Sequence, residues 1–106
     1  MTTAIHGEAC MTAIKLKTAN DSIFEVLIIL HFSEITKQKL KKFNQLLEFA
    51  GWVRVNLVIW IVNFANHLSK NEMTSIIKKD IEEAKNSSEI AGIYPYIQIK
   101  KKLSNL

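Results

Sequence analysis

The chain has 106 residues, which is the size of one domain and leaves no room for a separate catalytic domain. Apolar residues make up 48% and charged residues 23%, as in ordinary globular proteins, and three glycines and one proline exclude long disordered linkers. The net charge of +4 permits attraction to nucleic acid or anionic lipid, but it is too small to indicate a dedicated binder of either. The single cysteine, Cys10, excludes an internal disulfide, so we expect a reducing, cytoplasmic location.

The N-terminal segment, residues 1–11, has no regular pattern and no export signal. We expect it to form a loose arm before one α+β domain over residues 12–106. His6, Glu8 and Cys10 in this arm form an H-x-E-x-C run of three side chains that can bind metals. A structural zinc site needs four ligands, so we expect no bound metal and no cofactor.

The first two strands are predicted ahead of any helix. Residues 12–17 alternate as TAIKLK, which indicates a half-exposed strand. Turn-forming residues then follow at Asn20, Asp21 and Ser22. Residues 23–32, IFEVLIILHF, predict a second strand that enters the core. The apolar stretches 24–32 and 57–65 each span about nine residues, half of the roughly 20 that a membrane helix needs, so we expect no membrane segment.

A helix is expected directly after the second strand. Ser33 is predicted to end that strand and to cap a helix over residues 34–50. The apolar positions of this segment follow helical spacing, at Leu40, Phe43, Leu46, Leu47 and Ala50. Gly51 then predicts the end of the helix.

The middle of the chain predicts a buried strand and a second helix. Residues 53–64, VRVNLVIWIVNF, carry one charge among β-branched and aromatic residues, which indicates a central strand buried on both faces with Trp60 in the core. Ser69 and Glu72 have capping-box spacing, in which each side chain satisfies a backbone donor at a helix start. We expect this second helix to run to about Lys85.

Residues 92–101 contain the alternating run IYPYIQIK, which predicts a last strand from Ile93. Pro95 indicates an edge position or a bulge, because proline cannot donate to a strand ladder. The order strand, strand, helix, strand, helix, strand predicts an α+β two-layer sandwich, with a sheet of about four strands and two helices on one face. We expect a ferredoxin-like arrangement, either direct or circularly rearranged.

The second half of the chain resembles a family of small bacterial ferredoxin-like proteins related to CRISPR adaptation nucleases and to virulence-associated protein D. The resemblance lies in the run VNLVIWIVNF after Gly51-Trp52, the capped helix SKNEMTSIIKKDIEEA and the closing strand. In those nucleases an aspartate at the end of the first strand is associated with metal-dependent cleavage of RNA or DNA, whereas this chain has His31 or Phe32 there. The resemblance implies the architecture and dimerisation through sheet edges more than it implies catalysis.

No common catalytic signature is present in the sequence. It contains no G-x-S-x-G, no P-loop, no G-x-G-x-x-G and no H-E-x-x-H. His31 lies at the end of the predicted strand 23–32, and His67 follows the predicted strand 53–64. The two would meet at one edge of the sheet if those strands ran parallel, and there they could act as acid and base. The alternative is that each histidine marks the point where a buried strand meets water.

Lysines in the first helix and near the C-terminus define a candidate nucleic-acid interface. The side chains are Lys37, Lys41, Lys42, Lys100, Lys101 and Lys102. If they were adjacent in the fold, they would neutralise phosphates in a salt-sensitive contact that does not depend on base sequence. A solvated surface explains them equally well. Under this alternative the protein is an RNA- or DNA-binding protein or a nuclease, with His31 as the acid-base group.

The leading hypothesis is a protein interface. Tyr94 and Tyr96 share one face of the predicted edge strand, which is typical of a dimer or partner interface. Without catalytic motifs, this pattern favours a small, non-enzymatic bacterial interaction protein of the antitoxin, immunity or regulatory type. We expect it to bind a second copy of itself or a protein partner.

Overall fold

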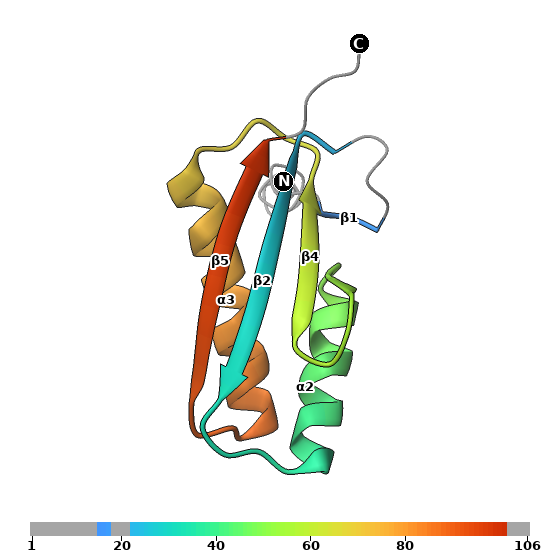
Figure 1. Cartoon of the computed structure of the whole chain (residues 1–106), viewed down its shortest axis with the longest axis vertical. Helices are drawn as coiled ribbons and strands as arrows, with labels where there is room; N and C mark the ends of the chain where they lie inside the picture. The colour runs from blue at the N-terminus through green and yellow to red at the C-terminus, as the bar shows by residue number, and fades with distance from the viewer. Residues whose placement is uncertain (1–14, 18–21, 102–106) are drawn as a thin grey trace, which may run out of the picture.

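The protein is described by a computed structural model over residues 15–17 and 22–101. This part of the chain forms five strands and two helices (Figure 1). The strands are β1 (Lys15–Leu16), β2 (Phe24–Phe32), β3 (Val53–Arg54), β4 (Ile59–Phe64) and β5 (Ile93–Lys101), and the helices are α2 (Lys37–Phe49) and α3 (Lys70–Ser88). The strands form one antiparallel sheet in the order β1-β4-β2-β5, and β3 also pairs with β4. The α+β class that the sequence predicts is confirmed.

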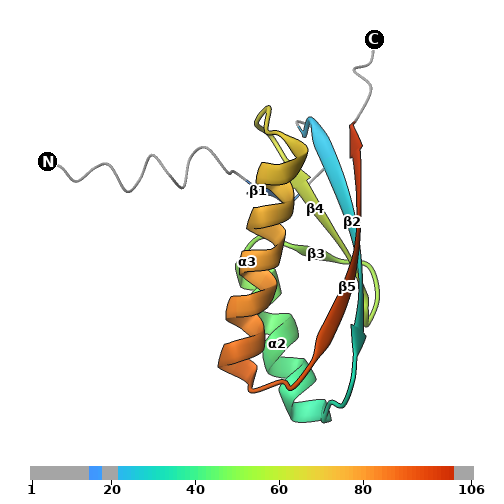
Figure 2. The ribbon, with the colours of Figure 1, turned by 90° about the vertical axis from the view of Figure 1, so that its left-hand side faces the viewer.

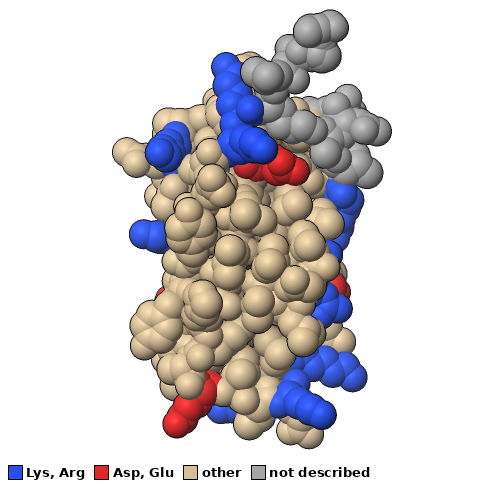
Figure 3. Space-filling view, viewed as in Figure 1, with Lys and Arg blue, Asp and Glu red and all other residues tan. Residues whose placement is uncertain are grey.

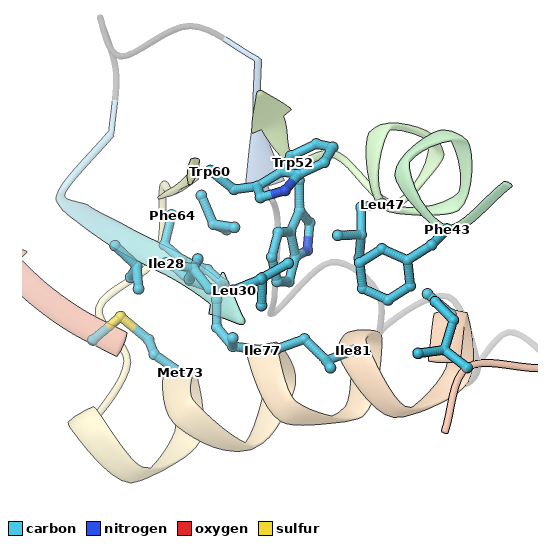
Figure 4. Packing of buried hydrophobic residues seen from close by; sticks show 14 residues of the cluster. Ile28, Leu30, Phe43, Leu47, Trp52, Trp60, Phe64, Met73, Ile77 and Ile81 are labelled. Carbon is cyan, nitrogen blue, oxygen red and sulfur yellow. The ribbon is translucent and has the colours of Figure 1, made fainter. Parts of the chain in front are cut away.

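The elements form two layers. Both helices lie against the same face of the sheet (Figure 2). The side chains between the layers form the core, and Figure 4 shows those from α2, α3 and the strands meeting there. The largest fully buried members are Trp52, Trp60, Phe43, Phe64, Ile28 and Leu30. Trp60 therefore lies in the core, as predicted.

Strands β2 and β5 pair along their whole length, from Phe24 opposite Lys101 to Phe32 opposite Ile93. The predicted strands within residues 23–32 and 92–101 are confirmed, each beginning one residue into the predicted range. The Ser33 N–H donates to the Gly92 carbonyl at 3.1 Å, so these two residues form a hydrogen-bonded pair. Along an antiparallel ladder, hydrogen-bonded pairs alternate with non-hydrogen-bonded pairs. Pro95, opposite Leu30, therefore falls on a non-hydrogen-bonded pair and costs no ladder bond. Among the described strands, β5 pairs with β2 alone, which confirms the edge position.

The prediction of one strand over residues 53–64 is wrong. The segment folds back on itself as the β3–β4 hairpin, with Val53 opposite Ile61. The Asn56 carboxamide oxygen accepts hydrogen bonds from the Val58 and Ile59 N–H groups, both at 3.0 Å. This side chain closes a turn inside an apolar run. Neither is the run buried on both faces, because alternate residues of β4 lie on the side of the sheet away from the helices.

The first helix begins three residues later than predicted. The N-cap of α2 is Thr36, whose hydroxyl accepts a hydrogen bond from the Lys39 N–H at 3.2 Å. Ser33 instead extends the β2–β5 pairing through its backbone N–H. Gly51 confirms the predicted end of the helix, because it adopts a left-handed φ of 102° directly after the C-cap.

The start of α3 is confirmed in detail. The Ser69 hydroxyl accepts from the Glu72 N–H at 3.0 Å, and the Glu72 carboxylate accepts from the Ser69 N–H at 2.8 Å. The helix continues to Ser88, beyond the predicted end, and stops at Glu89 in a left-handed conformation. Within the described ranges, neither helix is long and apolar enough to span a membrane.

Strand β1 covers only the last part of the predicted strand 12–17, and residues 12–14 lie outside the described part of the chain. Two lysines fix it to the helices. Lys15 Nζ lies 3.3 Å from the Asp80 carboxylate on α3, and Lys17 Nζ donates to the Glu48 carbonyl at 2.8 Å. The second contact places a positive charge at the C-terminal end of α2, where the helix dipole favours it.

Candidate functional site

The candidate site is the face of the sheet away from the helices, which we call the open face. Val26, Ile28 and Leu30 of β2 are fully buried toward the helices, so the residues between them point to the other side. Strand register arranges the side chains of the open face in four rows across β4, β2 and β5. The rows are Asn63, Glu25 and Lys100; Ile61, Leu27 and Gln98; Ile59, Ile29 and Tyr96; and His31 with Tyr94.

The two middle rows of the open face are apolar apart from one glutamine. In Figure 3 this face is a continuous uncharged surface, and the lysines and carboxylates lie around its margin. Glu25 and Lys100 sit side by side in the first row, at the end where β2 begins. Tyr94 and Tyr96 stand at the other end and are 63% and 55% exposed. The face therefore combines an apolar centre with a polar rim, the composition of a protein interface.

A shallow hollow lies at the charged end of the open face. It is lined by Glu25 and Leu27 of β2, Ile61 of β4, and Gln98 and Lys100 of β5, and its volume is about 150 Å³. Leu27 and Ile61 are apolar, and the other three side chains are polar. The hollow thus offers a surface for an apolar group that carries a polar tip.

The predicted interface residues, Tyr94 and Tyr96, both belong to this face. The apolar residues beside them, Leu27, Ile29 and Ile61, were assigned to buried strands by sequence reasoning, which missed their place on the open face. The predicted architecture itself contains the signal that would have found them. Two helices on one face leave the other face uncovered, so alternate residues of each apolar strand must lie there.

The two histidines do not meet. Strands β2 and β4 are antiparallel, so His31 lies at one end of the sheet while His67 follows the opposite end. The parallel arrangement on which the acid-base pair depended is therefore excluded. His31 is exposed and lies opposite Tyr94 in the register of the sheet.

The two lysine clusters also lie apart. Lys37, Lys41 and Lys42 are exposed on the first half of α2, which starts at the end of the sheet where β2 finishes. Lys100 and Lys101 lie opposite Glu25 and Phe24, where β2 begins. The length of a nine-residue strand, roughly 30 Å, separates the two ends. Lys102 lies outside the described residues.

No metal site was found in the part of the chain that the structure describes, where no group of three or more histidine, cysteine or acidic side chains is placed to hold an ion. The His6, Glu8 and Cys10 run lies outside these residues. A groove of about 430 Å³ runs between α2 and α3, beside Phe49, which is 93% exposed. The Asp80 carboxylate in this groove is already bound by Lys15 and by the Trp52 indole N–H.

No protein-family model, curated protein or solved structure matches this chain. The geometry of the open face is therefore the basis for the functional conclusion.

Proposed function

We propose that this protein is a small, non-enzymatic interaction protein that binds another protein surface through the open face of its sheet. The observation that carries the proposal is the pair of apolar rows around Leu27 and Ile29, next to two half-exposed tyrosines. Tyrosine is enriched at interfaces because its ring is apolar and its hydroxyl can hydrogen-bond. An antitoxin, immunity or regulatory role in the cytoplasm fits such a protein.

A ferredoxin-like architecture is part of the proposal. From β2 onward the elements follow the order strand, helix, strand, strand, helix, strand, and the sheet order is β5-β2-β4-β3. This element order is that of the split βαβ motif. It supports the ferredoxin-like class, with β1 as an additional strand beside β3 on β4.

The alternative is an RNA- or DNA-binding protein or nuclease that uses the lysines of α2. Lys37, Lys41 and Lys42 are exposed on one helix, which supports a contact with phosphates. The strand-end lysines, Lys100 and Lys101, lie at the other end of the sheet and form no continuous cluster with these three.

Sedimentation velocity of the full chain separates the two functions. We expect the wild-type protein to associate with itself equally well at low and high salt, with and without a pool of short RNA and DNA. Ile29→Lys, which puts a charge in the apolar centre, should abolish the association, whereas Gln38→Lys on the exposed surface of α2 should not. A complex with nucleic acid that dissolves at high salt, and that Ile29→Lys does not affect, would contradict the proposed function.

A further inference from the structure

We propose that the occupant of the open face is a second copy of this chain, related by a two-fold axis that runs perpendicular to the strands and crosses β2 at Ile28. The inference rests on the proposed function and names its partner. Its basis is the order of the four rows along the sheet, which is charged, apolar, apolar and aromatic. A face with this order is complementary to itself when it is turned end to end.

The two-fold axis pairs each row with a chemically suitable row of the second copy. An axis between the second and third rows places the first row on the fourth and the second row on the third. The Glu25 carboxylate then meets the His31 imidazole of the second copy, and Leu27 meets Ile29. Two sheets that pack face to face keep their strands within about 30° of each other. The axes of the outer two of three strands lie only about 10 Å apart, so this rotation displaces the outer strands little and the row pairing holds across the face.

The other in-plane axis, parallel to the strands, is excluded by charge. It would place each row on itself, so that Glu25 would face Glu25 of the second copy across an apolar interface. Like charges opposite each other at an interface are strongly unfavourable. The position of Glu25 in the central strand thus selects the end-to-end arrangement.

The tyrosines and the hollow give the same register. On β5, the end-to-end axis places Tyr96 over Gln98 of the second copy and Tyr94 over its Lys100, both of which line the hollow. A volume of about 150 Å³ accommodates an aromatic ring of the size of benzene. The Tyr96 ring then lies beside Leu27 of the second copy, while its hydroxyl reaches the polar side chains at the rim. Each copy both supplies and receives tyrosines.

The size of the face predicts a reversible dimer. Nine-residue strands are roughly 30 Å long and three strands are roughly 15 Å wide, so two copies bury about 900 Å² together. This is at the lower end of specific interfaces, where association is transient. The dimer should therefore form and dissociate with concentration across the micromolar range.

A charge exchange between two variants tests the arrangement. Glu25→Lys and His31→Glu should each weaken self-association roughly tenfold or more, because the first removes the acceptor for the His31 imidazole and the second places two carboxylates together, each twice in the homodimer. An equimolar mixture of the two variants should recover an affinity within about threefold of wild type, because the lysine introduced at position 25 then meets the glutamate introduced at position 31. Sedimentation equilibrium with one variant fluorescently labelled measures this, and Glu82→Lys and Gln45→Glu provide the same charge changes on exposed helix positions.

The outcomes separate this inference from the proposed function. If Ile29→Lys abolishes association but the mixture does not recover it, the two-fold arrangement is overturned and the proposed function stands. A wild-type chain that stays monomeric at every concentration overturns the second copy as occupant. If Glu25→Lys does not fold, Tyr96→Ala tests the same register at an exposed position, and unchanged affinity in that variant overturns the arrangement.

Discussion

At the scale of single residues, Asp80 connects three segments that are distant in the sequence. Its carboxylate accepts a hydrogen bond from the Trp52 indole N–H at 2.9 Å and lies 3.3 Å from Lys15 Nζ. The Lys15 and Asp80 side chains are only 16% and 14% exposed, so water screens the ion pair little. Trp52 in turn packs edge-to-face on Trp60, with ring centroids 5.9 Å apart. Asp80 therefore holds β1 and the buried tryptophans against α3.

Asp80→Ala should lower the free energy of unfolding by about 2 kcal/mol, because it leaves a partly buried indole N–H and an ammonium group without their acceptor. Asp80→Asn keeps a carbonyl oxygen for Trp52 and should cost less. Urea unfolding followed by tryptophan fluorescence measures both, since Trp52 and Trp60 are fully buried. Glu82→Ala, an exposed carboxylate on the same helix, is the control. Equal losses for Asp80→Ala and Glu82→Ala would contradict the role of Asp80.

At the scale of elements, the sequence predicts most of the strands and helices but not the break in the middle of the chain. The capping box at Ser69 is found because two side chains at fixed spacing satisfy two backbone groups locally. The β3–β4 turn has no glycine or proline, and it leaves Val55 and Leu57 exposed, against the usual preference of such residues for burial. The available signals were Asn56 and the length of the run, which is about twice that of an average strand.

Asn56→Ala should destabilise the protein by about 1 kcal/mol, because the Asn56 side chain is the acceptor for two backbone N–H groups of the turn. Asn56→Asp keeps an acceptor at the same position and should be close to wild type. Thermal unfolding by circular dichroism compares the two variants. A wild-type melting temperature for Asn56→Ala would mean that the hairpin does not depend on this turn.

The start of α2 shows a second limit of sequence reasoning. Ser33 and Thr36 are both suitable caps, and local preference does not choose between them. A tertiary contact decides between them, because the Ser33 backbone N–H donates to the carbonyl of Gly92, the residue before β5 and 59 residues further along the chain. A Cβ atom at Gly92 would lie 2.8 Å from the Ser33 hydroxyl, so a larger residue there would require the Ser33 side chain to turn away. Such a constraint cannot be read from residues 33–36 alone.

At the scale of the whole molecule, the two-layer arrangement gives the two faces of each strand different roles. The existence of an open face follows from the two predicted helices, but its four rows depend on strand register, which the sequence did not provide. Lysines and carboxylates lie at the margin of the open face, which keeps an uncharged centre (Figure 3). If the open face binds as proposed, neighbouring residues of β2 should therefore separate folding from association.

Ile28 and Ile29 provide the test of this separation, because they are adjacent in β2 and chemically identical. Ile28 is fully buried between the layers, so Ile28→Ala should lower the free energy of unfolding by about 2–5 kcal/mol through loss of burial and creation of a cavity. It should leave the dissociation constant of the folded chains within about threefold of wild type, a shift of about 0.7 kcal/mol. Ile29 lies on the open face and remains partly exposed.

Ile29→Ala should therefore show the opposite pattern. We expect its unfolding free energy to fall by only about 1–2 kcal/mol, since this side chain keeps part of its surface in water and its removal leaves no enclosed cavity. Its association should weaken roughly tenfold, because the apolar rows that meet in the dimer lose a central side chain. Urea unfolding and sedimentation equilibrium on the same preparations measure the two quantities independently. If Ile28→Ala weakened association as much as Ile29→Ala, the open face would not be the surface that binds.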